Sequence, residues 1–315
     1  MREFAIIDGV FAPMARSRPE VLLGMGDDAA ILAPGSGEHW CWSIDTLVEG
    51  VHFAVSDAPE DIGWKSLAVN LSDLAAMGAR PVAVLLALTL PDGDGAWVRA
   101  FARGFDALAA QHGVCLAGGD TTRGPRSISV TVMGALPAGS GLRRDGAREG
   151  DIIAVTGTLG DAALALRLGA RADADLRARL HRPMPRLAAG QALRGLAHAA
   201  VDVSDGLLAD LGHVMRASGT AAAVRADLLP ASKAFADAAP PQDRGALQAA
   251  GGDDYELCCC LAPDQVGEAV IALAALNLPL TVIGRVGAGK GAVQLMEADG
   301  TPVVLPADGY DHFSS

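Results

Sequence analysis

The stretch GMGDDAAIL, Gly24 to Leu32, places two adjacent carboxylates on a glycine-flanked turn that runs straight into apolar residues. Further acids border strand-like segments downstream: Asp45 after CWSI, Asp120 in GGDTTRG, Asp202 and Asp205 in VDVSDG, and Asp253 and Asp254 in GGDDYEL. Carboxylates that share a cavity repel each other unless a cation compensates their charge. We therefore predict that the chain folds so that these acids meet around divalent metal.

Composition limits the class of protein. With 315 residues, 50% hydrophobic and 20% charged, the chain can bury the cores of one large or two ordinary domains. Its net charge of -12 argues against nucleic acid or an anionic membrane as partner, because such surfaces require clustered Lys and Arg. The five Cys lack the CxxC spacing of zinc sites. Neither a signal peptide nor a membrane span is recognisable, so a cytoplasmic protein is predicted.

Hydrophobic periodicity predicts the same mixed alternation of strands and helices in both halves of the chain. Expected strands span 39–46, 82–90, 114–117, 127–136, 152–155, 199–203, 280–286 and 292–295. Expected helices run from an N-cap at Ser56 or Asp57 to Gly78, then over 94–112, 205–218 and 263–276. The segment 137–151 is rich in glycine and charge and has no apolar period, which predicts domains at 1–138 and 139–315.

One predicted helix carries an acid on a face that is not plainly solvated. A period of 3.6 residues puts Asp73 beside Ser66 and Asn70, opposite the face that carries Leu67 and Leu71. Asp73 is therefore added to the candidate site.

Oxygen ligands without clustered Cys or His select hard cations, and Mg²⁺ is usually held by carboxylates together with substrate phosphates and water. Glycines beside the acids, such as Gly119 and Gly206, allow backbone amides to approach phosphate oxygens. For a single Asp-Gly pair an ordinary turn is the commoner explanation, and Ser204 reads as a helix N-cap rather than a nucleophile. The repetition of acid and glycine favours metal-nucleotide chemistry.

A second glycine-rich stretch resembles a P-loop only in part. GRVGAGKG, residues 284–291, matches GxxxxGK, but Gly291 stands where a P-loop needs Ser or Thr for Mg²⁺. We interpret it as a glycine-rich hairpin.

With these residues in place, the chain resembles the thiamine-monophosphate kinase family of the PurM-like ATP-binding superfamily. Nine ordered motifs carry the resemblance over nearly the whole length: GDDAA, SIDTLVEGVHF, AVNLSDLAAMGARP, ALTLP, GGDTTRGP, VTGTLGDAA, DVSDGLLADLGH, GGDDYEL and GYDHF. The resemblance implies two αβ domains, with strands of the N-terminal domain pairing across a homodimer. It also implies ATP-dependent phosphorylation of thiamine monophosphate to thiamine diphosphate.

The resemblance also implies roles for individual residues. Metal ligands would be Asp27, Asp28, Ser43, Asp45, Asp73, Asp120, Asp202 and Asp205, of which Asp27 could instead only shape its turn. ATP would contact Gly119, Asp120, Arg144 and Ser204, and the thiamine phosphate would contact His52 and Asp253. Asp45, Asp120 and Asp205 would be catalytic. Ile44 and Ala307 depart from the family pattern, and Tyr310 or Phe313 could replace the aromatic missing at 307.

The implied mechanism agrees with these residue types. The acceptor is a phosphate that is already ionised, so positioning and charge neutralisation by magnesium ions and Arg144 suffice for direct in-line transfer. Alternatives are another PurM-like ATP-dependent enzyme, such as selenophosphate synthetase, aminoimidazole ribonucleotide synthetase or the hydrogenase maturation factor, or a catalytically silent nucleotide-binding homologue. The N-terminal turn lacks the Cys expected of the first, the chain ends in DHFSS without the Cys of the last enzyme, and the acids expected of an active enzyme are present.

Overall fold

The structure is a computed structural model and describes residues 6–14, 16, 18–23, 30–33, 35–305 and 309–310. The chain divides into two compact units, one formed by Met1–Leu74 with Ala79–Gly139 and the other by Ala75–Gly78 with Ser140–Ser315. Each unit contains its own sheet, so the architecture is the predicted mixed α/β fold with two αβ parts.

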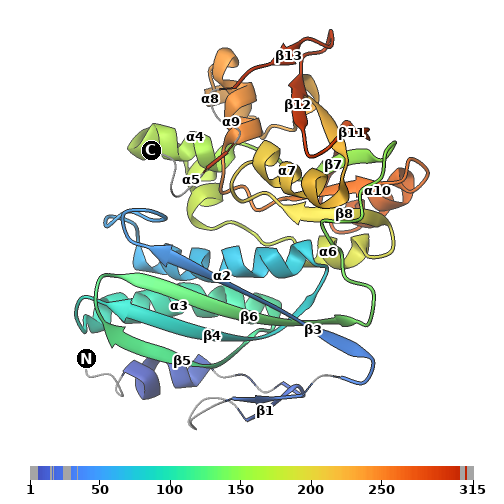
Figure 1. The fold of residues 1–315 in the computed structure, drawn as a ribbon. Helices are drawn as coiled ribbons and strands as arrows, with labels where there is room; N and C mark the ends of the chain where they lie inside the picture. Colours follow the sequence, from blue (N-terminus) through green and yellow to red (C-terminus); the bar gives the residue numbers. More distant parts are fainter. Residues whose placement is uncertain are drawn as a thin grey trace. The chain divides into compact units, whose positions relative to one another are not determined.

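The first unit is built on a four-stranded sheet in the order β3-β6-β4-β5. Its strands are β3 (Glu38–Val48), β4 (Arg80–Leu90), β5 (Cys115–Arg123) and β6 (Ser127–Pro137), and only β4 and β5 run parallel. Helices α2 (Pro59–Ala76) and α3 (Gly95–His112) lie along one face of this sheet (Figure 1). The chain before the sheet forms η1 (Ile7–Phe11), η2 (Ala12–Met14) and the short antiparallel pair β1 (Val21–Leu23) and β2 (Ile31–Leu32).

The face opposite the two helices is covered only in part. Val21 and Leu32, from the β1–β2 pair, pack with Trp40 against the buried residues Cys115 and Met133. Farther along β3 the same face is open, because Trp42 and Ile44 are 56% and 61% exposed. The sheet therefore has one helix-covered face and one face that is half bare.

The second unit contains a seven-stranded sheet in the order β13-β12-β9-β11-β7-β10-β8. The strands are β7 (Ile152–Thr156), β8 (Ala197–Asp202), β9 (Ala221–Arg225), β10 (Leu257–Leu261), β11 (Leu280–Gly287), β12 (Val293–Met296) and β13 (Pro302–Val303). The helices are α4 (Asp161–Leu168), α5 (Ala174–His181), α6 (Leu187–Leu193), α7 (Leu207–Ser218), α8 (Lys233–Ala238), α9 (Arg244–Ala250) and α10 (Val266–Ala274), with short turns η3 (Gly169–Arg171), η4 (Ala226–Leu228) and η5 (Pro241–Asp243).

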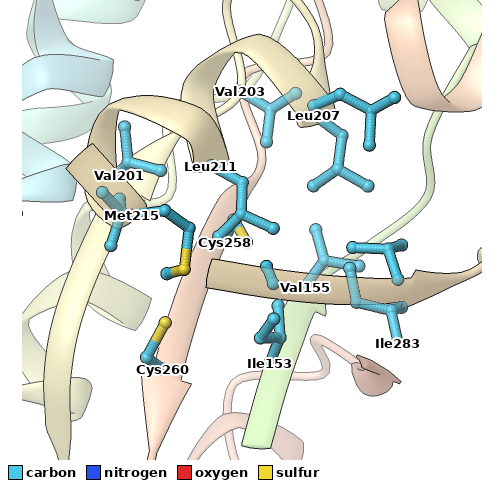
Figure 2. Close-up of a cluster of buried hydrophobic side chains, with 14 of the residues drawn as sticks. Ile153, Val155, Val201, Val203, Leu207, Leu211, Met215, Cys258, Cys260 and Ile283 are labelled. Carbon is cyan, nitrogen blue, oxygen red and sulfur yellow. The ribbon is translucent and has the colours of Figure 1, made fainter. Parts of the chain in front are cut away.

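The core of this unit lies between α7 and the sheet (Figure 2). Leu207, Leu211 and Met215 of α7 are buried in one cluster with side chains of the sheet, including Val155 and Cys258. These three helix residues recur every four positions, so they form one stripe of the helix surface. The stripe fixes the rotation of α7 on the sheet.

The structure confirms the predicted bounds of α3 to within one residue. Asp94 accepts from the N–H groups of Ala96 and Trp97 at the start of α3, and Gly113 closes that helix in the left-handed region with φ 63°. The predicted N-cap of α2 at Ser56 or Asp57 is wrong, because the helix begins at Pro59, where the missing N–H of proline costs nothing. The Asp57 carboxylate instead accepts from Ala54 N–H in the preceding turn at 2.8 Å.

Three predictions of local structure are wrong. Ser204 does not cap α7, which begins at Leu207 with Gly206 before it and no side-chain cap bond. The strand predicted over 114–117 is too short, because residues 118–123 continue the pairing with β4 and belong to β5. GRVGAGKG is not a hairpin: it forms the end of β11 and the connection to β12, and β9 lies between these two strands. A strand rather than a helix follows it, so the P-loop arrangement is missing there.

Candidate functional site

The first unit brings three of the predicted site residues together where α2 crosses β3. Ser43 Oγ donates to Asp73 Oδ2 at 2.5 Å. Two residues farther along β3, the backbone N–H of Asp45 donates to Asn70 Oδ1 at 2.8 Å. Because side chains alternate along a strand, Ser43 and Asp45 both point to the helix side of the sheet. The strand and the helix together present a serine and two carboxylates on one surface.

Asn70 is the residue that ties the helix to the strand. It is fully buried, and its Nδ2 donates to the carbonyl of Ser66 one turn earlier at 2.9 Å. This second bond fixes the orientation of the amide, so that Oδ1 is turned toward Asp45 N–H. Asn70 was noted in the sequence only as a neighbour of Asp73; its role shows only once the strand is placed against the helix.

Asp120 lies on the other face of the same sheet. Asp120 pairs with Ala87 on β4, and Ala87 pairs with Ser129 on β6. Ser129 in turn pairs with Thr46 on β3. Paired residues in a sheet point to the same face, and Thr46 Oγ1 lies 2.7 Å from Ser129 Oγ on the exposed face. Asp45 is the neighbour of Thr46, so its side chain points to the opposite face. Within the first unit, Asp120 is therefore not brought beside Asp45.

Gly119 precedes Asp120 in β5 and has φ 156°. A Cβ at this position would lie 1.9 Å from the carbonyl oxygen of Leu86 on β4. The close contact between the two strands therefore requires glycine here. His52 lies beyond the end of β3, where its Nδ1 accepts from Val48 N–H at 3.0 Å.

The second unit gathers its predicted residues at one edge of its sheet. Asp202 ends β8 and pairs with Leu257, the first residue of β10. The next strand across, β7, ends at Thr156 beside the start of β10. The motifs DVSDG, GGDDYEL and TGTLGD therefore meet at this edge, because each adjoins the end of one of three neighbouring strands.

The turn after β8 is held by two distant segments of the chain. Ser204 O accepts from Asp253 N–H at 2.8 Å, and Asp205 O accepts from Tyr310 N–H at 2.9 Å. Gly309 fits closely here, because a Cβ on it would lie 2.8 Å from Asp205 O. The tail and the GGDDYEL loop thus both dock on the turn that carries Ser204 and Asp205.

The N–H groups of the same turn are taken by one carboxylate. Asp210 Oδ2 accepts from Ser204, Asp205 and Gly206 N–H at 2.9, 3.1 and 3.1 Å. Asp210 lies in α7 and is 4% exposed. Burial, and to a lesser extent the charge of Asp205, raise the pKa of Asp210 to about 6, while the three N–H bonds act in the opposite direction.

Asp253 sits in a strained loop. Asp253 and Tyr255 have φ values of 68° and 50°, a region that side-chain-bearing residues adopt at some cost. The hydroxyl of Tyr255 donates to Asp253 Oδ1 at 2.9 Å, and the bond from Asp253 N–H to Ser204 O holds the other side. The loop therefore depends on its neighbours for its conformation.

A buried ionic network lies beside this loop, around Glu256, which is fully buried where the loop leads into β10. Arg186 binds both carboxylate oxygens, through Nε at 2.7 Å and Nη2 at 2.5 Å. Arg179 Nη2 adds a bond at 2.8 Å, and Thr156 Oγ1 one at 2.7 Å. Asp254 accepts from Gly160 N–H at 3.0 Å, and its complete burial raises its pKa. Sequence reasoning missed this network because its cations are on α5 and just before α6, far from GGDDYEL in the chain.

Arg144 is exposed, and its carbonyl accepts from Ser218 Oγ at the end of α7 at 2.8 Å. Burial lowers the pKa of His213 on α7, the charges of Arg216 and Arg144 lower it further, and that of Asp205 acts against them. Arg144 and Asp205 therefore both lie in the surroundings of His213. Asp27, Asp28, Ala307 and Phe313 fall outside the described residues, so their predicted roles remain predictions.

All the donors collected at these two places are oxygens, which is the ligand chemistry that Mg²⁺ prefers. Among the residues that the structure describes, no group of three or more His, Cys, Asp or Glu side chains is close enough to hold a metal ion. The site acids belong to two different units: Asp45, Asp73 and Asp120 to the first, and Asp202, Asp205 and Asp253 to the second. None of the described helices is long and apolar enough to cross a membrane.

Comparison with known proteins decides the family. The family models of AIR synthase related protein match the chain twice, the N-terminal domain at residues 26–136 and the C-terminal domain at 148–295. The thiamine-monophosphate kinase of Escherichia coli K12 is 43% identical over 321 residues, covering 99% of this chain and 98% of that protein. The chain belongs to the thiamine-monophosphate kinase family. The family member from Bacillus subtilis is 34% identical over 99% of this chain and 100% of its own length.

Solved structures of the family have the same fold. The thiamine-monophosphate kinase of Stenotrophomonas maltophilia K279a has a TM-score of 0.88 at 50% identity, covering 96% of this chain and 98% of that one. AaThiL complexed with AMPPCP and TMP has a TM-score of 0.76 at 30% identity, covering 99% of both chains. The hydrogenase maturation protein HypE of E. coli reaches a TM-score of 0.80 at only 22% identity over 98% of both chains, which shows a shared fold alone. The predicted family and two-part PurM-like fold are confirmed.

Proposed function

We propose that this chain is an ATP-dependent kinase that phosphorylates thiamine monophosphate to thiamine diphosphate. The observation that carries the proposal is the 43% identity to a thiamine-monophosphate kinase over nearly the entire length of both proteins. The relative complexed with AMPPCP and TMP supports the two substrates, since AMPPCP is an analogue of ATP. A catalytically silent homologue is not favoured, because Ser43, Asp45 and Asp73 are held together at the crossing of β3 and α2.

Magnesium is the proposed metal. In the first unit Ser43, Asp45 and Asp73 supply oxygen donors, and Asp27 and Asp28 would add to them; in the second unit Asp202 and Asp205 are the donors. Bound Mg²⁺ would neutralise the charge of the phosphates. The Ser43 hydroxyl, which donates to Asp73 here, keeps its lone pairs for a cation.

Each substrate is assigned its own residues. Gly119, Asp120, Arg144 and Ser204 are proposed to contact ATP, and His52 and Asp253 the thiamine phosphate. Asp253 is held by Ser204 and Tyr255, which supports a role in positioning a substrate group rather than in proton transfer. Asp45, Asp120 and Asp205 are proposed as the catalytic carboxylates.

The proposed reaction is direct in-line transfer. An oxygen of the acceptor phosphate, already ionised near neutral pH, attacks the γ-phosphorus of ATP, and the bond from that phosphorus to the β–γ bridging oxygen breaks to release ADP. Proton abstraction by the protein is not required. Catalysis then rests on positioning by the acids and on the positive charge of Arg144.

A homodimer is part of the proposal. The open face of the first sheet carries Trp42 and Ile44, 56% and 61% exposed, on β3, an edge strand of 11 residues. Exposed aromatic and aliphatic side chains on a sheet face are typical of an interface. Asp120 points to this same face, so a second copy packed here would lie near it. A cytoplasmic location and a domain division at 138/139 also stay proposals.

The test is a steady-state assay with ATP, Mg²⁺ and thiamine monophosphate, with free thiamine as the control acceptor. We expect thiamine diphosphate and ADP in equal amounts and no phosphorylation of thiamine. If no diphosphate forms, the proposed function is wrong. A protein that becomes covalently phosphorylated by γ-labelled ATP would contradict direct transfer while leaving the substrate assignment intact.

A further inference from the structure

Each backbone polar group of the turn Val203–Gly206 has a hydrogen-bond partner in the chain. Its carbonyls are bonded by Tyr255, Asp253, Tyr310 and Asp210 N–H in that order, and its N–H groups by Glu256 O and then three times by the Asp210 carboxylate. Buried backbone groups are normally paired, but here three successive donors converge on a single side-chain oxygen. That oxygen is Asp210 Oδ2.

Three consecutive N–H groups that point to one centre form a concavity that binds anions. In this turn the concavity is filled by a carboxylate of the chain itself, at 2.9 to 3.1 Å from each nitrogen. A phosphate oxygen of a nucleotide therefore cannot use these amides. The expectation that Gly206 would let backbone amides cradle a phosphate does not hold here, and the side chains of Ser204 and Asp205 are what the turn can offer to ligands.

The position of Asp210 is itself fixed by the packing of α7 on the sheet. It follows Leu207 and precedes Leu211 in α7, and these two leucines are buried in the core between α7 and the sheet (Figure 2). Asp210 is 4% exposed, so its carboxylate has little freedom to move. Asp210 therefore connects three N–H groups of the turn to the core beneath α7.

We propose that Asp210 is a positioning residue that orients Asp205 and Ser204 for binding of the metal-nucleotide. The inference rests on the proposed function of Asp205 as a metal ligand and Ser204 as an ATP contact. Asp210 touches neither substrate nor metal; it acts by holding the backbone from which both side chains project. A group that fixes a metal ligand in this way is typically worth about 10–100-fold in metal affinity or activity.

The simpler explanation is that Asp210 only stabilises the start of α7. Both explanations predict a lower unfolding temperature when Asp210 is replaced, so stability alone does not decide between them. Asp151 provides a matched control because it is also a buried carboxylate, 3% exposed, that accepts from a backbone N–H, that of Arg148, at 2.8 Å. It precedes β7, at the sheet edge opposite Asp202, since Leu261 pairs with Ile152 and Leu257 with Asp202.

The experiment compares D210A, D210N and D151N with the wild type in the full chain. Mn²⁺ binding is followed by electron paramagnetic resonance in the presence of ADP, and the dependence of turnover on Mg²⁺ concentration is followed with ATP and thiamine monophosphate. We expect D210A to weaken Mn²⁺ binding and raise the Mg²⁺ concentration for half-maximal rate by about 10-fold or more. D151N should lose stability but keep both values.

D210N provides the test if D210A does not fold, since its amide keeps the shape and one acceptor oxygen but loses the charge. It should shift both metal readouts in the same direction by a smaller factor. Wild-type metal dependence in the folded Asp210 variants, or an equal shift in D151N, overturns the inference. An inactive wild type would instead refute the proposed function, and the Mn²⁺ titration would still report on Asp210.

Discussion

The two units hold their acidic residues by different means. In the first unit, Ser43 and Asp45 on β3 face Asn70 and Asp73 on α2, and side chains of the helix accept the bonds from the Ser43 hydroxyl and the Asp45 N–H. In the second unit, Asp205 sits on an irregular turn whose backbone is bonded by three other segments of the chain. The first arrangement consists of a strand and a helix in contact. The second is a turn in which each backbone N–H and C=O group has a hydrogen-bond partner.

This difference predicts how far the structural effect of a substitution extends. A change at the β3–α2 crossing should act locally, because strand and helix are held by their own backbone bonds and by the core between them. A change in the partners of the turn at 203–206 should spread, because the GGDDYEL loop and the tail at Gly309–Tyr310 dock on the same backbone groups. Substitutions can therefore separate the two arrangements by their effects on activity and on stability.

The largest expected effect is on turnover in the first unit. Asp45→Asn keeps the shape of the side chain and the bond from its N–H to Asn70, but it removes one proposed metal charge. We expect kcat to fall by on the order of 10²–10³-fold, as when a preorganised electrostatic group is lost, with an unchanged unfolding temperature. Asp106→Asn, in α3 of the same unit, is the control and should be active. A wild-type rate in Asp45→Asn would remove Asp45 from the site.

The next effect is on stability in the second unit. Glu256→Gln leaves Arg179 and Arg186 beside an uncharged partner in a buried position. Loss of one partner of a buried ion pair typically costs about 3–5 kcal/mol, and here the lower end is expected because both arginines are about one-fifth exposed. Urea unfolding measures the loss.

The same substitution tests whether the loop effect spreads. Because Glu256 adjoins the strained residues Asp253 and Tyr255, we also expect a higher KM for thiamine monophosphate. Asp237→Asn, which removes the exposed pair with Lys233 on α8, is the control and should change neither value. A large stability loss with an unchanged KM would show that the network supports the core but not the loop.

Asn70→Ala is expected to have a smaller effect than either. It leaves the N–H of Asp45 without its buried acceptor, which typically lowers the free energy of unfolding by about 1–3 kcal/mol. It also removes the bond that holds Asp45 of β3 against α2. Turnover should therefore fall together with stability. Ser66→Ala, one turn earlier, removes a bond to the carbonyl of Gly63 without touching β3, so it should leave kcat unchanged. Equal losses of kcat in both variants would mean that Asn70 acts only through the helix.

The sequence predicted elements well where the cause is local. The helix predicted over 94–112 agrees with α3 to within one residue, because its ends are decided by a few neighbouring residues, the N-cap Asp94 and the left-handed Gly113. It failed at Ser204 and at GGDTTR, where the residues bond partners in another element: Asp210 on α7, and β4 along residues 118–123. Glycine and serine preferences describe a free chain, and tertiary contacts overrode them.

The site could be predicted as a list of acids but not as an arrangement. That Asp73 turns away from the leucine stripe follows from helical periodicity, and its contact with Ser43 agrees with this. That Asp120 faces away from Asp45 depends on the register of three strand pairs, which no single segment specifies. The roles of Asn70, Asp210 and Glu256 were missed because their partners lie 25 residues, 4 to 6 residues and 70 or more residues away, in elements whose packing had to be known first.

The smallest expected effect concerns thiols, and it contrasts the two sheets directly. Cys258, Cys259 and Cys260 lie in β10, between β7 and β8, and burial raises the pKa of Cys259 to about 12 and that of its two neighbours as well. Thiolate is the reactive form, so these three should not react with a disulfide reagent at pH 8 until the protein is unfolded in urea.

Cys41 is only half buried and lies on β3, two residues from Ser43 and on the same face. Burial and then the charge of Asp73 raise its pKa, so Cys41 should react slowly but before the β10 thiols. Mg²⁺ with ATP should slow labelling of Cys41 further and leave the β10 thiols unaffected, and Cys41→Ser should abolish the first phase. Rapid native labelling of β10 would contradict the burial of its three thiols. A Cys41 rate indifferent to Mg²⁺ and ATP would place the ligands away from the β3–α2 crossing.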